Sequence, residues 1–179
     1  LLGRFVRSLA PQAMLVAGLT PVVGQDETFR KGFTIKAEKC PNRRGVERVI
    51  EGLGGRWMTF DAFLAEASAG RYRAAYVTGG YPVDWVSPGV RAALGGVPTL
   101  IVQDLLPSTL EQAASVIVPS APWTEREGTF MNCDGLLQPF ERAASPLEGL
   151  KPDGQFLFEL AGESGLYRGR RVREKMAQT

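Results

Sequence analysis

The residues best suited to chemistry follow three apolar runs that are predicted to be β-strands. Gly79-Gly80-Tyr81-Pro82 follows the first run, Gln103-Asp104 ends the second, and a polar loop from Pro119 to Asn132 follows the third. Paired glycines let a ligand approach the backbone and expose N–H groups to a phosphate. Asp104 could accept a hydrogen bond from a sugar hydroxyl or a guanine-like edge, or it could cap the next turn. Alone, the Gly-Gly-x-Pro pattern is more often simply a turn.

The sequence does not pair a nucleophile with a base. The chain has no histidine, which excludes Ser-His-Asp and Cys-His catalysis and every histidine-ligated metal site within it. Its only cysteines are Cys40 and Cys133, whereas iron–sulfur clusters generally use four protein thiolates. Glu125 and Glu127 could act as acid and base, but no nucleophile accompanies them, and Thr129 has no activating base nearby in sequence. The residues therefore favour binding over catalysis and predict no metal site.

Composition is that of an ordinary globular chain. Its 179 residues are 44% hydrophobic and 22% charged, enough for one large domain with a core or for a domain with an appendage. The net charge of +2 gives no electrostatic case for nucleic acid or an anionic membrane. No apolar run approaches the roughly 20 residues of a spanning helix. We expect a soluble intracellular protein without nucleic acid or direct membrane insertion, and a fragment of a longer chain because the first residues are not Met and already resemble the middle of a helix.

The elements that must position these residues alternate between strands and helices. Asn42, Thr59 and a capping box at Ser108 to Glu111 are predicted to begin three helices, and Gly54-Gly55 to end the first. Thr20 to Gly32 is predicted to be a loop. Predicted strands cover residues 14–17, 33–36, 74–78, 99–104 and 116–118, and predicted helical segments cover residues 1–10, 46–53, 60–67, 90–94, 108–115, 153–161 and 168–178.

This alternation predicts an α/β fold with a mostly parallel sheet flanked by helices, Rossmann-like in arrangement. We expect residues 1–150 to form the α/β domain and residues 151–179 a C-terminal helical tail. The tail is basic from Arg168 onward and is predicted to be a solvated helix or a contact to a neighbouring subunit. Lys39, Arg43 and Arg44 lie at a predicted helix start that already carries positive potential. An anion or an acidic partner loop would balance them, and a solvated turn is the alternative.

The order of the motifs is more specific than any one of them. A strand ending in Gly-Gly-x-Pro is followed by T-L-I-V-Q-D and then by A-S-V-I-V-P-S-A-P-W-T-E-R-E-G-T-F-M-N-C-D-G-L-L-Q. This order resembles the molybdopterin oxidoreductase superfamily. Within it, E-K-C-P-N-R-R-G-V-E with the downstream glycines resembles the large iron–sulfur subunit of NADH:quinone oxidoreductase, respiratory complex I. The resemblance spans residues 39–160 and is most specific at residues 113–138.

The resemblance implies a pocket at the strand ends. Active members hold a pterin dinucleotide there, while a separate part of their chain ligates molybdenum or tungsten; in the complex I subunit the pocket is vestigial and the clusters lie upstream. Leu136 replaces the family's usual arginine, and Tyr81 stands where asparagine is more common. Both changes favour a degenerate, structural pocket. The positions that would line it are Gly79, Gly80, Pro82, Gln103, Asp104, Glu127, Gly128, Thr129 and Asn132.

By this resemblance we expect a largely structural fragment of an NADH dehydrogenase subunit in the respiratory chain. The parent would pass electrons from NADH toward quinone through iron–sulfur clusters outside the fragment, which would itself hold no cofactor. Its partners would be the other subunits of the complex, in the cytoplasm and peripherally attached to the inner membrane. One alternative is a molybdopterin-dependent catalytic subunit, formate dehydrogenase-like, in which Gly79, Asp104 and Thr129 would touch the cofactor. A second is a non-catalytic nucleotide-binding or scaffold module.

Overall fold

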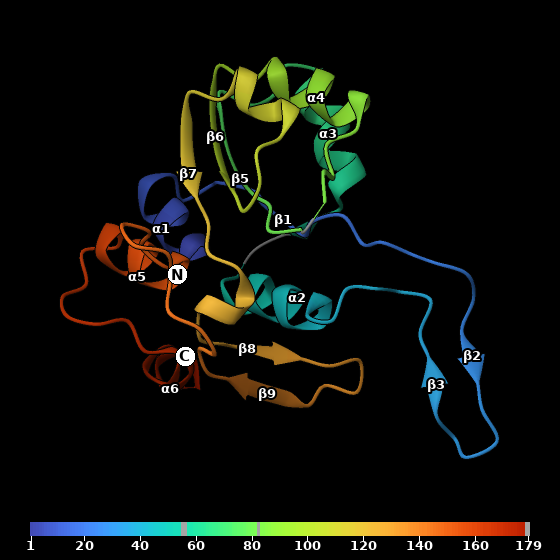
Figure 1. Ribbon diagram of the computed structural model, residues 1–179. Helices are drawn as coiled ribbons and strands as arrows, with labels where there is room; N and C mark the ends of the chain where they lie inside the picture. The colour runs from blue at the N-terminus through green and yellow to red at the C-terminus, as the bar shows by residue number, and fades with distance from the viewer. Residues whose placement is uncertain (55–56, 82, 178–179) are drawn as a thin grey trace.

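A parallel sheet forms the upper half of the molecule in Figure 1. The computed structural model describes residues 1–54, 57–81 and 83–177. The sheet consists of β5 (Ala74–Thr78), β6 (Thr99–Asp104) and β7 (Val116–Pro119) in that order, with both pairs parallel. The helices α3 (Phe60–Ser68) and α4 (Pro88–Gly95) and the 3-10 helix η1 (Thr109–Ala113) lie on one side of it (Figure 1). These elements confirm the predicted α/β fold class.

The hydrophobic core lies between this sheet and its helices. Side chains alternate across a strand, so Leu100 and Val102 of β6 point to the same face, and both are fully buried. Leu94 of α4 and Leu110 of η1 are fully buried in the same cluster. The β-branched and leucine-rich runs therefore supply one side of the core, and short helices supply the other.

One predicted helix cap is confirmed, one helix begins earlier than predicted, and one predicted cap is wrong. Thr59 caps α3, its hydroxyl accepting a hydrogen bond from the N–H of Ala62 at 3.3 Å, and α4 begins at Pro88, two residues before the predicted start. The predicted capping box does not form. The Ser108 hydroxyl makes no side-chain cap, and its oxygen is buried without a partner in the described part of the chain. A short 3-10 helix forms instead, and β7 pairs with β6 from Val116 onward.

A second group of elements lies beneath the sheet (Figure 1). The loop predicted between Pro119 and Asn132 is wrong in part, since it contains the 3-10 helix η2 (Trp123–Glu125) and a strand that forms an antiparallel hairpin. The Asn132 side chain accepts hydrogen bonds from the N–H groups of Asp134 and Leu136, which fixes the hairpin turn. The remaining elements of this group are α2 (Arg43–Gly52), β8 (Gly128–Met131), β9 (Leu137–Phe140) and α6 (Gly169–Ala177).

The Asn42 side chain does not cap α2 as predicted. Its Oδ1 accepts a hydrogen bond from the N–H of Met131 at 2.8 Å, which ties the start of α2 to β8. A Cβ at Gly45 would lie 2.2 Å from this oxygen, so glycine leaves room for it. The helix ends at Gly52, one residue before the predicted end, and Gly55 lies outside the described residues. Tertiary contact thus outcompetes local capping here.

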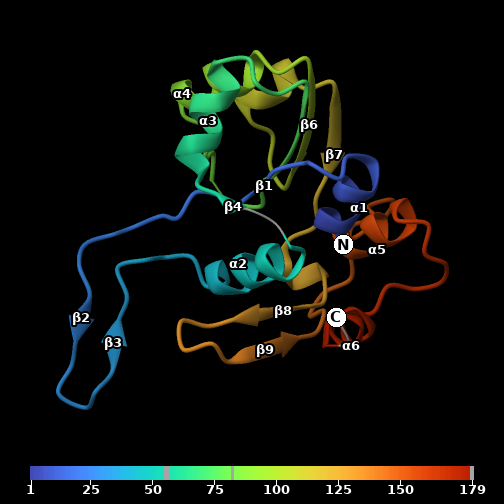
Figure 2. The same ribbon diagram turned by 180° about the vertical axis from the view of Figure 1, so that it is seen from behind.

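The other elements include α1 (Leu2–Leu9) and two short strand pairs. β1 (Leu15–Val16) runs parallel to β4 (Trp57–Met58), which was not predicted. β2 (Glu27–Thr28) pairs antiparallel with β3 (Thr34–Ile35), so the prediction of a loop from Thr20 to Gly32 is wrong at β2. This second pair projects from the body in two opposite views (Figures 1 and 2), and we call residues 21–39 the arm. The remaining helix is α5 (Asp153–Leu160).

The described residues contain no helix that is long and apolar enough to cross a membrane.

Candidate functional site

The carboxyl ends of the three parallel strands meet at one edge of the sheet. That edge faces α2 and the β8–β9 hairpin (Figure 1). The ladder continues one residue past each strand pair, because the N–H of Gly79 donates to the carbonyl of Gln103 at 2.7 Å and the N–H of Ser120 donates to that of Asp104 at 2.9 Å. The structure thus brings Gly79, Gly80, Gln103 and Asp104 together. Pro82, also predicted for this site, lies outside the described residues.

Asp104 is buried at this edge and accepts three hydrogen bonds from its own chain. Its Oδ1 accepts from the N–H of Gly80 at 2.8 Å and of Leu105 at 2.7 Å, and its Oδ2 accepts from the indole N–H of Trp85 at 2.7 Å. A Cβ at Gly79 would lie only 2.1 to 2.3 Å from the carboxylate atoms, so the carboxylate occupies the space of a side chain there. The Leu105 contact is the turn cap that the sequence offered as one interpretation.

A second carboxylate, Asp153, reaches the same edge from the first residue of α5. It accepts hydrogen bonds from the Ser120 hydroxyl at 2.8 Å and from the Gln103 amide at 3.3 Å, and it forms an ion pair with Arg126. The Tyr76 hydroxyl donates to Gln103 Oε1 at 2.9 Å, which extends the network along the sheet. Burial, followed by the charge of Asp153, raises the pKa of Tyr76 to about 12. We call these five residues the Asp153 network.

Sequence reasoning missed the role of Asp153. An aspartate at the start of a predicted helix normally indicates a favourable interaction with the helix dipole. Its partners lie 33 residues away at Ser120 and 50 away at Gln103, and no local pattern indicates this pairing. Trp85 was missed for the same reason. Only the convergence of strand ends, which the parallel sheet imposes, could have suggested that a polar cluster forms here.

The predicted site residues of the hairpin make a different set of contacts. Glu127 Oε1 accepts from the N–H of Gly169 at 2.7 Å, and Thr129 Oγ1 accepts from Arg173 Nη1 at 2.8 Å. These bonds hold the basic helix α6 against β8, so the predicted tail contacts its own chain. A Cβ at Gly128 would lie 2.8 Å from the Phe140 ring. Among described residues, the side-chain hydrogen bonds of Glu127, Thr129 and Asn132 all stay within the hairpin and α6.

The cationic residues at the start of α2 are balanced by the chain itself. Arg43 forms ion pairs with Glu38 of the arm and with Glu47 of its own helix, both at 2.8 Å. Lys39 donates to the carbonyl of Lys36. The charge conflict predicted for this position is thus relieved by a nearby carboxylate in the arm and another one turn along the helix.

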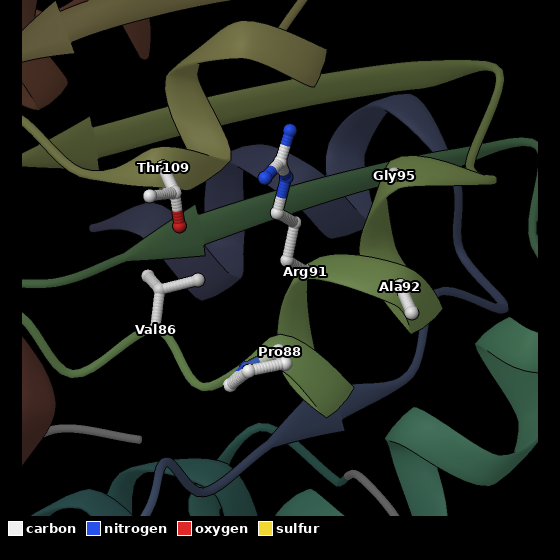
Figure 3. Close-up of a pocket in the computed structure, with 6 residues that line it drawn as sticks. All are labelled: Val86, Pro88, Arg91, Ala92, Gly95 and Thr109. Atoms are coloured by element: carbon white, nitrogen blue, oxygen red, sulfur yellow. The ribbon is translucent and has the colours of Figure 1, made fainter.

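Two surface hollows lie away from the strand-end residues. One of about 540 Å³ lies between α4 and η1, where Figure 3 shows its lining side chains. Its single charged lining residue, Arg91, donates to Gln112 Oε1 at 2.7 Å. The other, of about 210 Å³, lies where β1 and β4 end and is lined by residues that include Arg43, Trp57 and Asp61. Neither is lined by Gly79, Gly80, Gln103 or Asp104.

Comparison with known proteins gives a consistent result. Residues 56–163 match the family described as molybdopterin oxidoreductase, a region that holds all three strand ends and the hairpin. The chain is 33% identical over 185 residues to formate dehydrogenase H of Escherichia coli (strain K12), covering 89% of this chain and 26% of that protein. It is 34% identical over 158 residues to NADPH-Fe(3+) oxidoreductase subunit alpha of Geobacter sulfurreducens, covering 84% and 17%. It is 33% identical over 112 residues to the G subunit of NADH-quinone oxidoreductase from Mycobacterium bovis, covering 61% and 14%. The chain thus spans about a quarter or less of each of these relatives.

Proposed function

Because the chain belongs to the molybdopterin oxidoreductase family, we propose that it is a structural α/β part of a large NADH-quinone oxidoreductase subunit, of the same type as the Mycobacterium bovis relative. The parent passes electrons from NADH toward quinone through iron–sulfur clusters that lie outside these 179 residues. The other subunits of that complex are its partners, and the complex holds it peripherally at the cytoplasmic side of the membrane. The resemblance of E-K-C-P-N-R-R-G-V-E to the complex I subunit supports this type.

The observation that carries the structural role is the set of partners around Asp104. A pterin dinucleotide at this edge requires free backbone N–H groups or cations for its phosphates and a free acceptor for its polar ring edge. The N–H groups of Gly79 and Gly80 both donate within the chain, and Asp104 accepts three hydrogen bonds from the chain itself. Arg126, a cation of the same edge, is paired with Asp153. This arrangement fits the dinucleotide poorly, and it supports a junction that fastens α5 and η2 to the sheet.

A second candidate is a catalytic subunit of the formate dehydrogenase type. The observation that favours it is coverage, since the match to formate dehydrogenase H extends over 89% of the chain, against 61% for the NADH-quinone oxidoreductase relative. In that case Gly79, Asp104 and Thr129 would contact the cofactor. Trp85 would then have to leave Asp104, and Arg173 would have to leave Thr129. The metal of such a cofactor would be held elsewhere in the parent.

Metal and pterin analysis of the full-length protein separates these candidates. We expect no stoichiometric molybdenum or tungsten, and co-purification with a flavin-containing subunit that oxidises NADH. Stoichiometric metal together with a pterin dinucleotide would overturn the proposal in favour of the catalytic subunit. A full-length protein with neither the metal nor an NADH-oxidising partner would overturn both and favour a nucleotide-binding or scaffold module.

A further inference from the structure

The arm is a self-contained β-hairpin. Its backbone hydrogen bonds run from the base, where the N–H of Lys39 donates to the carbonyl of Pro21 at 2.8 Å, to the tip, where the N–H of Phe29 donates to that of Phe33 at 2.8 Å. Only Glu38 at the base forms an ion pair with the body, through Arg43, among the described residues. The arm therefore keeps its shape through its own bonds, although an isolated two-stranded hairpin is marginally stable in water.

The two faces of the arm differ in chemistry. Successive side chains of a strand point to opposite faces, and the register pairs Glu27 with Ile35 and Thr28 with Thr34. The even-numbered face is polar, and its side chains pair with one another. Thr28 and Thr34 share a hydrogen bond at 3.0 Å, and Lys36 forms an ion pair with Asp26 at 2.8 Å. The odd-numbered face carries Glu27 together with an apolar row formed by Phe29, Phe33 and Ile35.

The apolar row has no cover in the described structure. Phe33 is 61% exposed, and Phe29 and Ile35 are exposed as well. The rings of Phe29 and Phe33 lie 5.7 Å apart and form one continuous apolar surface at the tip. Single exposed apolar residues are normal on a protein surface, but an ordered row along one face of a projecting element indicates a contact surface.

The tip adds a charge requirement. Arg30 and Lys31 occupy the turn between the two phenylalanines, and within the described residues neither forms an ion pair. A surface that covers the apolar row must also approach these two cations. Acidic groups on that surface would be complementary to them and would speed association.

We propose that the arm docks through Phe29, Phe33 and Ile35 in an apolar groove of a partner protein whose rim is acidic where it meets Arg30 and Lys31. A protein suits the arm better than a lipid bilayer, because both outer edges of the hairpin carry backbone groups that hydrocarbon leaves without hydrogen bonds. A protein groove can pair such an edge while its pockets take alternate side chains. The inference rests on the arm alone and holds for either type of oxidoreductase.

Site-specific photo-cross-linking in the full-length protein, expressed in its own host, tests this proposal. A benzophenone side chain replaces Phe33 on the apolar row or, as the matched control, Thr34 on the polar face of the same strand. We expect position 33 to cross-link to one protein segment that combines apolar and acidic residues, with a yield about tenfold above that of position 34. The double reversal Arg30→Glu and Lys31→Glu should lower the yield from position 33 about tenfold. Changing the acidic residues of the identified segment to lysine should restore it.

Several results would overturn the proposal. These are cross-links mainly to lipid, to a second copy of this chain or to another part of the same polypeptide, and equal yields from the two faces. A yield from position 33 that ignores the charge reversal would also overturn it. Arg30 and Lys31 are at an exposed turn, so the reversal tests the contact without disturbing the fold, and circular dichroism of the variant verifies this.

Discussion

The strand-end edge and the arm use their side chains in opposite ways. At the edge, the carboxylates of Asp104 and Asp153 take hydrogen bonds from several elements far apart in sequence. In the arm, the hydrogen bonds are local, and apolar side chains such as Phe33 remain exposed. The comparison indicates that the edge contributes to the stability of this chain, whereas the apolar row of the arm contributes to contacts beyond it.

Physical reasons connect these two patterns to stability. A buried carboxylate that loses its donors, or a donor that loses its carboxylate, incurs a desolvation cost that no other contact offsets. Truncating an exposed apolar side chain changes the free energy of unfolding very little, because that side chain buries little area in the folded state. Substitutions at the edge should therefore lower the free energy of unfolding much more than substitutions on the arm.

The largest effect is expected for Asp153→Ala. The change leaves the Arg126 guanidinium and the Ser120 hydroxyl without their acceptor, and it should lower the free energy of unfolding by about 3 kcal/mol. Glu159→Ala on the same helix is the matched control. Its ion pair with Lys151 is solvent-exposed, so a much smaller loss is expected. Urea denaturation measures the free energy of unfolding of both variants. Equal losses would show that the Asp153 network stabilises the chain no more than an exposed ion pair does.

The next effect is expected for Gly79→Ala. The added Cβ would lie 2.1 to 2.3 Å from the Asp104 carboxylate, which must move and weaken its bond to Trp85. Such overpacking costs about 2 kcal/mol. Gly89→Ala in α4 is the control, because its nearest neighbour is the Ser87 hydroxyl at 3.8 Å and alanine is the better helix former. A thermal melt should show a clearly lower melting temperature for Gly79→Ala and no decrease for Gly89→Ala. The reverse order would refute the close approach of the Asp104 carboxylate to Gly79.

The sequence predicted the sheet well because the signals for it are local. Continuous apolar runs at residues 74–78 and 99–104 match β5 and β6 in full, and Thr59 caps its helix as its position indicates. The hairpin of β8 and β9 was missed although Asp134-Gly135 is a hairpin signal, since the polar, glycine-marked residues before it are equally typical of a ligand-binding loop.

The candidate site could be placed from sequence but its bonds could not. Parallel strands bring Gly79 and Asp104 to one edge, and this follows from topology alone. The partners of Asn42 and Asp153 lie 89 and up to 50 residues away, and such pairs depend on how the two halves pack. Asn42 looks like a local helix cap, but its Oδ1 accepts from the distant N–H of Met131. In that orientation the oxygen points away from the N–H groups at the start of α2, so it caps none of them.

A smaller effect is expected on how the stability of the chain changes with pH. The pKa of Tyr76 is about 12 in the folded chain and 10.0 for an unperturbed tyrosine, so between these values the unfolded chain loses the proton while the folded chain keeps it. The contribution of Tyr76 to stability is present below pH 10 and is lost as the pH rises toward 12. Tyr76→Phe should therefore reduce the drop in urea midpoint between about pH 9 and about pH 11. An unchanged drop would show that burial and the charge of Asp153 do not raise the pKa of Tyr76 in the folded chain.

The smallest effect is expected for Phe33→Ser in this chain alone. Phe33 is 61% exposed, so the free energy of unfolding should change by no more than about 0.5 kcal/mol. Phe63→Ser in α3 is the contrast, because Phe63 is buried in the core and its truncation should cost about 3 kcal/mol or more. A loss of about 2 kcal/mol at Phe33 would mean that the arm folds back on its own chain in solution, and the apolar row would then be an internal contact. A negligible loss at Phe33, together with impaired assembly of the full-length protein, would separate the stability of the chain from its docking and would sharpen the difference between the arm and the strand-end edge.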